Sequence, residues 1–438
     1  MMSEADINKH LPKMTQLEDG YAPLAPSSVK ATGIAKGVLL DLALKTAYVL
    51  PQFTTQDVAA RMYLPQVVVA ELLEQLRSEM MLEVLGHTED KGYRFVIAQQ
   101  GRERAQQLLE VSGYIGPAPV SLESYTAMFE WLDAQPHPVS SDQVKGALSE
   151  LVMEDDAIEI AGMAVSSNRS LFLSGPPGNG KTSMGRCLHN VRPGEIWIPH
   201  CIAVEHNIIR LFDSHCHQPV EVKPQTTHAV DARWIKIKRP FVVAGGEMTL
   251  ESLDMAYLPS LRYYEAPLHM KANGGTFLID DFGRQHVEPS ALLNRWIIPL
   301  EHRIDFLTLF GGQKIQVPFL LMLIIATNLK PEDVTDPAFL RRLGYRLHVP
   351  GPTPESYTKI FHDYASRYNL EMSQEFMDWL LARYKNENRE LRACEPRDLI
   401  ERARDICKYR KEDMRIDKEL IELAWVAYFG NKEIKDVA

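Results

Sequence analysis

The stretch from Leu171 to Cys187, LFLSGPPGNGKTSMGRC, carries residues whose types and spacing suit the binding of a phosphate group. An apolar strand, a glycine-rich turn and a helix start follow one another, and the turn matches G-x-x-x-x-G-K-[ST] in that setting. Glycines let the backbone amides approach the phosphates, and the helix adds its positive end. Lys181 would reach the β- and γ-phosphates of a nucleotide, and Thr182 would bind Mg²⁺. The predicted nucleotide-binding residues are Gly175, Pro176, Pro177, Gly178, Asn179, Gly180, Lys181, Thr182 and Ser183.

A second apolar run, GGTFLIDDFGR, ends in two acidic residues, Asp280 and Asp281. The carboxyl ends of parallel strands face the ligand crevice of an α/β sheet, so these carboxylates are expected near the phosphates. We predict that Asp280 holds the metal and that Asp281 orients or deprotonates the attacking water. The alternative is that the two acids cap a helix.

Two further pieces follow along the chain. LMLIIATNL is a buried strand that places Asn328 at the crevice edge, and DPAFLRRLGYRLHV is a short helix ending in Arg341 and Arg342, then a strand. With GPPGNGKT, FLIDD, IIATN and AFLRR in this order, residues 138 to about 430 resemble the AAA+ ATPases. An ordinary exposed helix end is the alternative for the two arginines.

The resemblance implies a role for each residue. Asn328 corresponds to sensor 1, which helps to position the water, and Arg342 corresponds to the arginine finger that reaches a neighbouring subunit, with Arg341 as the fallback. Arg397, at the start of CEPRDLIERARDIC, corresponds to sensor 2. The resemblance also implies ATP and Mg²⁺ as cofactors, a homo-oligomeric ring, most simply a hexamer, and a protein client that hydrolysis remodels.

One motif departs from the family. Most AAA+ proteins carry Asp-Glu where this chain has Asp280-Asp281, and aspartate is one methylene shorter. A catalytic group misplaced by about 1 Å can cost on the order of 10² in rate, so we expect slow turnover or a site that closes more tightly. ATP binding is therefore the firmer expectation, and an ATP-gated scaffold with little hydrolysis is an alternative function.

A hairpin, IDFLTLFGGQKIQVPF, is predicted before the Asn328 strand. Its position resembles the pre-sensor-1 hairpin of magnesium-chelatase, MoxR-type and enhancer-binding AAA+ proteins. The chain lacks the GAFTGA loop of the enhancer-binding activators.

The N-terminal third is predicted as a flexible leader over 1–33, a winged-helix-like (α+β) domain over 34–112 and a linker over 113–137. A winged helix suggests DNA binding through its third helix. Residues 34–111 hold eight Lys or Arg against ten Asp or Glu, a balance that disfavours DNA because phosphate neutralisation supplies most non-specific affinity. Protein contact is favoured, and a DNA-directed ATPase remains the alternative.

The remaining segments are an α/β core over 138–350, with a β-rich insertion at about 190–250, and a helical lid over 351–438. The predicted fold class is α/β, a doubly wound parallel P-loop AAA+ sheet with a C-terminal helical lid. The insertion also holds potential metal ligands, whose spacing does not suit a tetrahedral zinc site. These residues are His200, Cys201, His206, His215, Cys216 and His217.

Bulk properties limit the class of protein. The 438 residues carry a formal net charge of −10, which argues against a protein that mainly coats nucleic acid or an anionic membrane. The longest apolar run, Phe319–Ala326, is too short to cross a membrane, and the first 28 residues contain no apolar signal segment. Five scattered cysteines indicate no disulfide framework, so a cytoplasmic location is expected.

Overall fold

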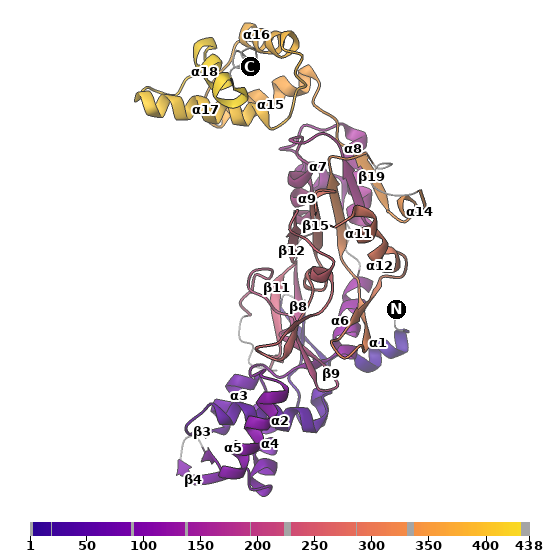
Figure 1. Cartoon of the computed structure of the whole chain (residues 1–438), viewed down its shortest axis with the longest axis vertical. Helices are drawn as coiled ribbons and strands as arrows, with labels where there is room; N and C mark the ends of the chain where they lie inside the picture. Colours follow the sequence, from indigo (N-terminus) through magenta and orange to yellow (C-terminus); the bar gives the residue numbers. More distant parts are fainter. Residues whose placement is uncertain are drawn as a thin grey trace, which may run out of the picture. The chain divides into compact units, whose positions relative to one another are not determined.

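The computed structural model describes residues 3–18, 20–88, 92–135, 139–192, 194–222, 229–285, 287–330 and 337–430 (Figure 1). Predictions for residues 331–336 of the core and 431–438 of the lid, and for short pieces of the leader, linker and insertion, lie outside these ranges. The chain divides into two compact units. The first comprises 1–137, 193–277 and 286–322, and the second comprises 138–192, 278–285 and 323–438.

The second unit contains the predicted nucleotide-binding motifs. Its elements are α7 (Ser141–Ala147), α8 (Asp155–Ser166), β7 (Leu171–Ser174), α9 (Lys181–Asn190), the end of β15 (Thr276–Phe282), most of β18 (Met322–Thr327), α14 (Pro337–Leu340), β19 (Tyr345–His348), α15 (Pro354–Ser366), α16 (Gln374–Asn386), α17 (Glu395–Arg410) and α18 (Lys418–Phe429).

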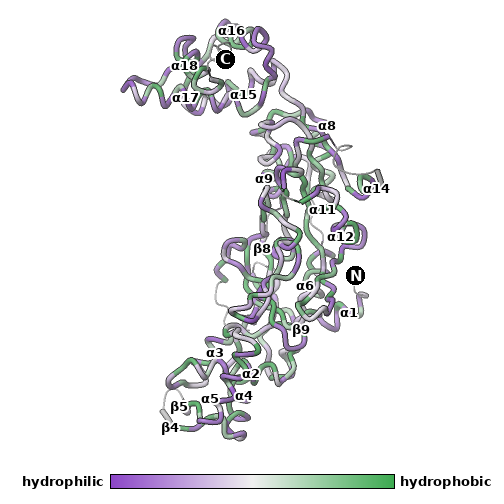
Figure 2. The backbone as a smooth tube through the Cα atoms, in the orientation of Figure 1, coloured by the Kyte–Doolittle hydropathy of each residue, from purple (hydrophilic) through white to green (hydrophobic). Residues whose placement is uncertain are grey.

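The main sheet has the order β12-β15-β18-β7-β19, with β12 spanning Phe241–Ala244. Strands β18 and β19 flank β7 and run parallel to it, pairing Ile324 and Tyr345 with Leu171. Strands β7 and β18 are buried along their whole length and apolar except for their last residues, Ser174 and Thr327, as expected when helices cover both faces of a parallel sheet. Figure 2 colours hydrophobic stretches of the backbone green. The strand before Asn328 therefore lies between the strand before the glycine-rich loop and the strand that ends in two acids. This part of the chain is an α/β fold with a parallel sheet, as predicted.

Four helices, α15 to α18, occupy the segment predicted as a lid, which we continue to call the lid, and they share one hydrophobic core. Each has an apolar face that buries residues such as Phe361, Leu380, Leu399 and Trp425. Thr353, Ser373 and Asp417 cap α15, α16 and α18 by accepting backbone N–H bonds, which defines where these helices begin.

The first unit holds the N-terminal segments and the strand-rich part of the chain. Its elements are α1 (Glu4–His10), β1 (Met14–Leu17), β2 (Gly20–Pro23), η1 (Lys30–Thr32), α2 (Lys36–Tyr48), β3 (Phe53–Thr54), α3 (Thr55–Met62), α4 (Gln66–Ser78), β4 (Leu82–Thr88), β5 (Gly92–Ile97), α5 (Gln99–Val111), β6 (Val120–Ser121), α6 (Leu122–Ala134), β8 (Glu195–Pro199), β9 (Cys201–Val204), β10 (Asn207–Arg210), β11 (Trp234–Lys238), β12, η2 (Glu251–Leu253), β13 (Ala256–Leu258), β14 (Tyr263–Glu265), α10 (Leu268–Lys271), the start of β15, α11 (Pro289–Arg295), α12 (Ile297–His302), β16 (Ile304–Thr308) and β17 (Lys314–Pro318).

Residues 36–111 contain the predicted helices and hairpin. Strands β4 and β5 are antiparallel, and β3 adds a third strand beside β5. Thr54 caps the start of α3: its Oγ1 accepts the N–H of Asp57 at 3.3 Å, and Asp57 Oδ2 accepts the N–H of Thr54 at 2.8 Å. These local elements are confirmed, while the winged-helix assignment stays a prediction.

The predictions of a flexible leader over 1–33 and of a linker over 113–137 are wrong for the described residues. Strands β1 and β2 pair, Ala22 is buried, and Trp197 donates its indole N–H to Tyr21 O at 2.9 Å. Helix α6 buries Tyr125 and Phe129 against neighbouring apolar residues. Both segments contain Pro and Gly, but their apolar side chains bury against distant strands, which outweighs the local tendency to remain open.

The predicted β-rich insertion contains strands, and they continue past residue 250 to Glu265. These strands share a hydrophobic core with the helices of residues 36–111, because Cys201, Ala203 and Ile208 pack in the same cluster as the helix residues. Buried Arg233 joins three segments: it pairs with Asp231 and donates to Thr32 O at 2.9 Å and to Pro119 O at 3.2 Å. Among the described residues, no helix is both long and apolar enough to cross a membrane.

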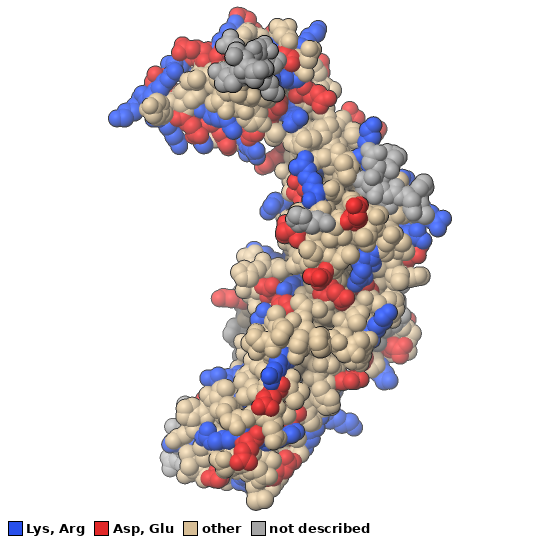
Figure 3. All heavy atoms as spheres, viewed as in Figure 1, with Lys and Arg blue, Asp and Glu red and all other residues tan. Residues whose placement is uncertain are grey.

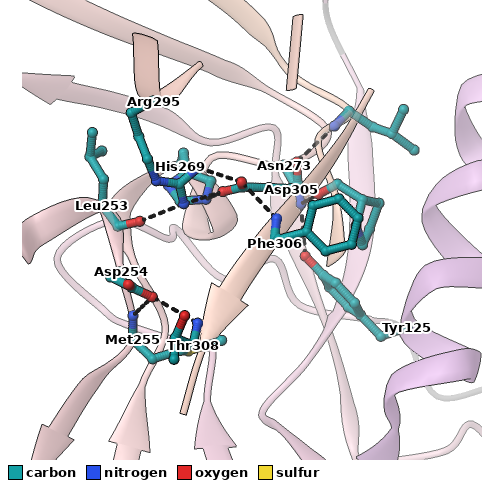
Figure 4. Close-up of polar contacts among 12 residues, drawn as sticks. Tyr125, Leu253, Asp254, Met255, His269, Asn273, Arg295, Asp305, Phe306 and Thr308 are labelled. Carbon is teal, nitrogen blue, oxygen red and sulfur yellow. Dashed lines mark hydrogen bonds and ion pairs between the residues drawn. The ribbon is translucent and has the colours of Figure 1, made fainter. Parts of the chain in front are cut away.

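The predicted hairpin is formed by β16 and β17, and a buried charge cluster holds its first strand (Figure 4). Asp305 is 2% exposed and accepts Arg295 Nη1 at 2.5 Å and Nη2 at 2.8 Å. His269 Nε2 lies 2.9 Å from Asp305 Oδ2 of the same carboxylate. Burial alone would raise the pKa of Asp305, but the hydrogen bonds from His269 and Arg295 outweigh burial and hold that pKa below its usual value.

We expect Asp305→Ala to lower the free energy of unfolding by about 3–5 kcal/mol, because it leaves a half-buried arginine and a buried histidine without their carboxylate. A carboxyl whose pKa is depressed in the folded state stabilises the fold above its unfolded pKa of about 3.9, and the contribution is lost as the pH falls through the lower folded value. Urea unfolding at pH 7 and at pH 3 measures both effects. Asp254→Ala is the control, because Asp254 accepts only N–H groups of Met255 and Thr308 at the same hairpin. Equal losses for the two variants would contradict the prediction.

Candidate nucleotide-binding site

The glycine-rich loop connects β7 to α9 in a conformation that ordinary residues avoid. Gly178 and Gly180 both have φ of +82°, in the left-handed region that favours glycine. A Cβ on Gly178 would also lie 2.6 Å from Cys394 Sγ, so this position has no room for a side chain. Helix α9 begins at Lys181 directly after Gly180, which directs its free N–H groups toward the loop.

Lys181 lies across the loop. Its Nζ donates to Gly175 O, Pro176 O and Asn328 Oδ1, each at 2.8 Å. Burial lowers the pKa of Lys181, and the nearby carboxylates of Asp280 and Asp281 oppose this shift. The ammonium group is thus held by neutral oxygens in a position where phosphate oxygens could replace them.

Thr182 and Asp280 form the pair expected of a magnesium site. Thr182 Oγ1 donates to Asp280 Oδ2 at 2.7 Å, although the two residues are far apart in sequence. Hydroxyl and carboxylate oxygens are hard ligands of the kind that Mg²⁺ binds together with waters and phosphate oxygens. The donor set therefore fits the ion, and Thr182 and Asp280 are the residues that would hold it.

Asn328 connects the lysine to the second acid. While its Oδ1 accepts Lys181, its Nδ2 donates to Asp281 Oδ1 at 3.1 Å. Asp281 is exposed and has φ of +49°, an uncommon conformation for a residue other than glycine. The structure thus brings Lys181, Asn328, Asp281 and the Thr182–Asp280 pair together at the carboxyl ends of β7, β18 and β15, as predicted.

A family model described as a domain of unknown function (DUF8689) matches residues 353–427, which form most of the lid. A search of curated proteins found no match to the chain. Among solved structures, the chain is similar to NtrX from Brucella abortus in complex with ADP, with 15% identity and a TM-score of 0.39 over 64% of this chain and 56% of that one. It is also similar to the Holliday junction branch migration motor RuvB from Thermotoga maritima, with 14% identity and a TM-score of 0.38 over 68% of this chain and 76% of that one. The chain spans less than two thirds of the NtrX chain.

The two candidate finger residues, Arg341 and Arg342, lie at the amino ends of the parallel strands. The glycine-rich loop of the same chain follows the carboxyl end of β7. The two arginines follow α14 and precede β19, whose first residue, Tyr345, donates its N–H to Ser170 O at 2.9 Å. Ser170 lies five residues before Gly175, or roughly 16 Å along an extended strand. Arg341 is exposed and Arg342 is half-buried. Neither position suits a role in the phosphate site of the same chain.

Arg397, the candidate sensor 2 residue, pairs with its sequence neighbour. Its side chain is 55% exposed and pairs with Asp398 Oδ1 at 3.0 Å. The hydrogen bond to Asp398 raises the pKa of Arg397 above its usual value. The lid reaches the loop through earlier residues: Ala393 N–H donates to Asn179 Oδ1 at 3.1 Å, and Cys394 N–H donates to Gly178 O at 2.9 Å. Sequence reasoning missed these contacts, which come from residues 391–394, just before α17 begins at Glu395.

The histidines and cysteines of the insertion have structural roles where they are buried. His217 Nδ1 accepts the N–H of Asp213 at 3.0 Å, and its Nε2 lies 2.9 Å from Lys271 O, so both ring nitrogens are engaged. Cys201 Sγ forms hydrogen bonds with the Tyr114 hydroxyl and with Pro117 O. Burial lowers the pKa of His200 to about 4. Within the described ranges, no three His, Cys, Asp or Glu residues are grouped as metal ligands.

Proposed function

We propose that this protein is an AAA+ ATPase that binds Mg-ATP at Gly175–Ser183 and couples its hydrolysis to the remodelling of a protein client in an oligomeric ring. The observation that carries the proposal is the polar chain from Lys181 through Asn328 to Asp281, with Thr182 and Asp280 beside it. The five side chains come from three motifs, and each has the chemistry that phosphoryl transfer to water requires.

The residues divide the work as follows. The loop amides and Lys181 bind the β- and γ-phosphates, and Thr182 and Asp280 hold Mg²⁺, which neutralises the phosphate charge. Asp281 accepts hydrogen bonds at the crevice edge, where it can orient the attacking water and take its proton. Asn328 fixes the Asp281 carboxylate through its Nδ2 and so acts as a positioning residue.

Lys181→Ala tests the proposal. We expect it to weaken ATP binding on the order of 10²-fold, because it removes a buried charge from the phosphates, and to abolish phosphate release. Equilibrium binding of a fluorescent ATP analogue and multiple-turnover phosphate release measure the two effects. Lys145→Ala removes an exposed lysine on α7 of the same unit and should behave as the wild type. Wild-type affinity in Lys181→Ala would contradict the site assignment.

Two alternative functions predict different results. An ATP-gated scaffold would bind the analogue without multiple-turnover phosphate release above the Lys181→Ala background. A DNA-directed ATPase would bind duplex DNA through residues 34–112, with an affinity that falls steeply with salt.

The surface of α4, the helix that would enter a DNA groove, supports a protein partner instead. Its exposed residues include Glu71 and Glu74, which pair with Lys36 and Arg77 and so occupy the nearby basic groups. On the face shown in Figure 3, basic and acidic atoms alternate over this module instead of forming one basic patch. Such a surface offers little counter-charge to a phosphate backbone.

A further inference from the structure

Asn179, in the middle of the glycine-rich loop, is directed away from solvent and toward the lid. It is 8% exposed, and its Oδ1 accepts the N–H of Ala393 at 3.1 Å. Its neighbour Gly178 accepts the N–H of Cys394 at 2.9 Å through its carbonyl oxygen. Two consecutive loop residues are therefore bonded to two consecutive lid residues, a pair of contacts that we call the clasp.

The packing around the clasp is close on both sides. A Cβ on Gly178 would meet Cys394 Sγ at 2.6 Å, and one on Gly351, where the chain enters the lid, would meet Leu391 O at 3.0 Å. The same Cβ would lie 4.0 Å from Asn179 Nδ2. The lid segment 391–394 thus lies directly against the loop.

The amide group of Asn179 is only half satisfied. Its Nδ2 is buried and has no hydrogen-bond partner among the described residues. A buried donor without a partner costs stability, so a leucine of similar size would serve better if the position only filled space. The side chain is therefore better explained by its acceptor, which bonds the lid.

We infer that Asn179 is a positioning residue that couples the phosphate-binding loop to the lid, so that phosphates in the loop order the lid and the docked lid slows the release of nucleotide. The inference rests on the proposed nucleotide site. The loop amides that bind phosphate belong to the same short segment whose other groups accept from the lid, so a change in one is transmitted to the other. A ligand that orders one side lowers the cost of ordering the other.

Asn179→Leu removes the acceptor at nearly constant volume, and Ala393→Pro removes the donor from the lid side. In the full chain we expect each variant to release a fluorescent ATP analogue about three- to tenfold faster than the wild type, as for the loss of one hydrogen bond. Nucleotide should also protect the amides of residues 391–410 from hydrogen exchange in the wild type, and less so in both variants. Ala393→Ser keeps the N–H group and should match the wild type.

The double variant distinguishes coupling from separate structural damage. If both substitutions break one bond, the release rate of Asn179→Leu/Ala393→Pro equals that of the single variants, whereas independent damage multiplies the two effects. Wild-type release from Asn179→Leu, or multiplied effects in the double variant, would overturn the inference. A wild-type protein that does not bind the analogue, or binds it no better than Lys181→Ala, would instead overturn the proposed function.

Discussion

Replacing Arg342 by alanine is expected to leave ATP binding intact and to slow turnover by about 10³-fold or more, the effect expected when an arginine finger is removed. The structure gives a reason to expect that the finger acts between subunits. Arg342 lies at the amino ends of the parallel strands, whereas the loop of its own chain lies at their carboxyl ends. Strand β19 begins at Tyr345 beside Ser170 and ends near the loop. A second copy of the chain can bring this edge to a phosphate site.

A mixing experiment tests the subunit arrangement. Arg342→Ala keeps Lys181 in its loop, and Lys181→Ala keeps Arg342. In the proposed ring, a mixture of the two variants therefore forms some sites with Lys181 from one subunit and Arg342 from its neighbour. We expect phosphate release by the mixture to exceed the sum of the two separate proteins. Arg341→Ala is the matched control, since it removes the same charge one residue away. Unchanged turnover in Arg342→Ala, or loss of turnover in Arg341→Ala alone, would move the finger to another residue.

The Asp281→Asn variant should still bind ATP, and its rate of ATP hydrolysis should fall by about 10²- to 10⁴-fold, the range expected for the loss of a general base. Asparagine tolerates the left-handed conformation that Asp281 adopts at φ +49°, so the substitution changes the charge with little effect on the backbone. Single-turnover phosphate release measures the chemical step directly. Asp363→Asn in the lid removes an exposed carboxylate and provides the control for charge alone.

The outcome for Asp281→Asn also bears on the unusual acidic pair. If Asp281→Asn turns over ATP at the rate of an active wild type, another group positions the water. If the wild type and Asp281→Asn are equally slow, the result favours the ATP-gated scaffold. A pull-down with Asp281→Asn in ATP is then a direct route to the client, because a nucleotide-locked ring should retain it longest.

Much of the second unit could be predicted from the chain because its signals are local. The loop needs glycines at positions 178 and 180, where φ is positive, and the strands before Lys181, Asp281 and Asn328 are continuous apolar runs of the kind that become buried parallel strands. The caps at Thr54 and Thr353 likewise depend on residues three or fewer positions away. In each case the cause lies within a few residues of its effect.

The errors concern segments whose conformation depends on distant partners. Residues 20–23 and 120–134 contain turn-forming residues, yet they become a paired strand and a buried helix because Trp197, Ile198 and other distant residues cover them. Burial of apolar surface is non-directional and has no sequence signature at the segment that it orders.

By itself, the sequence predicted an α/β core with a phosphate-binding loop, since the four motifs and their order prescribe which strands carry the loop, the acids and Asn328. Only the tertiary structure decided that Asn328 joins Lys181 to Asp281, that the candidate finger lies across the sheet from its own loop, and that Asn179 bonds the lid. The physical reason is that motifs follow from backbone requirements within a few residues, whereas these contacts join residues up to 214 positions apart and exist only once the core has packed.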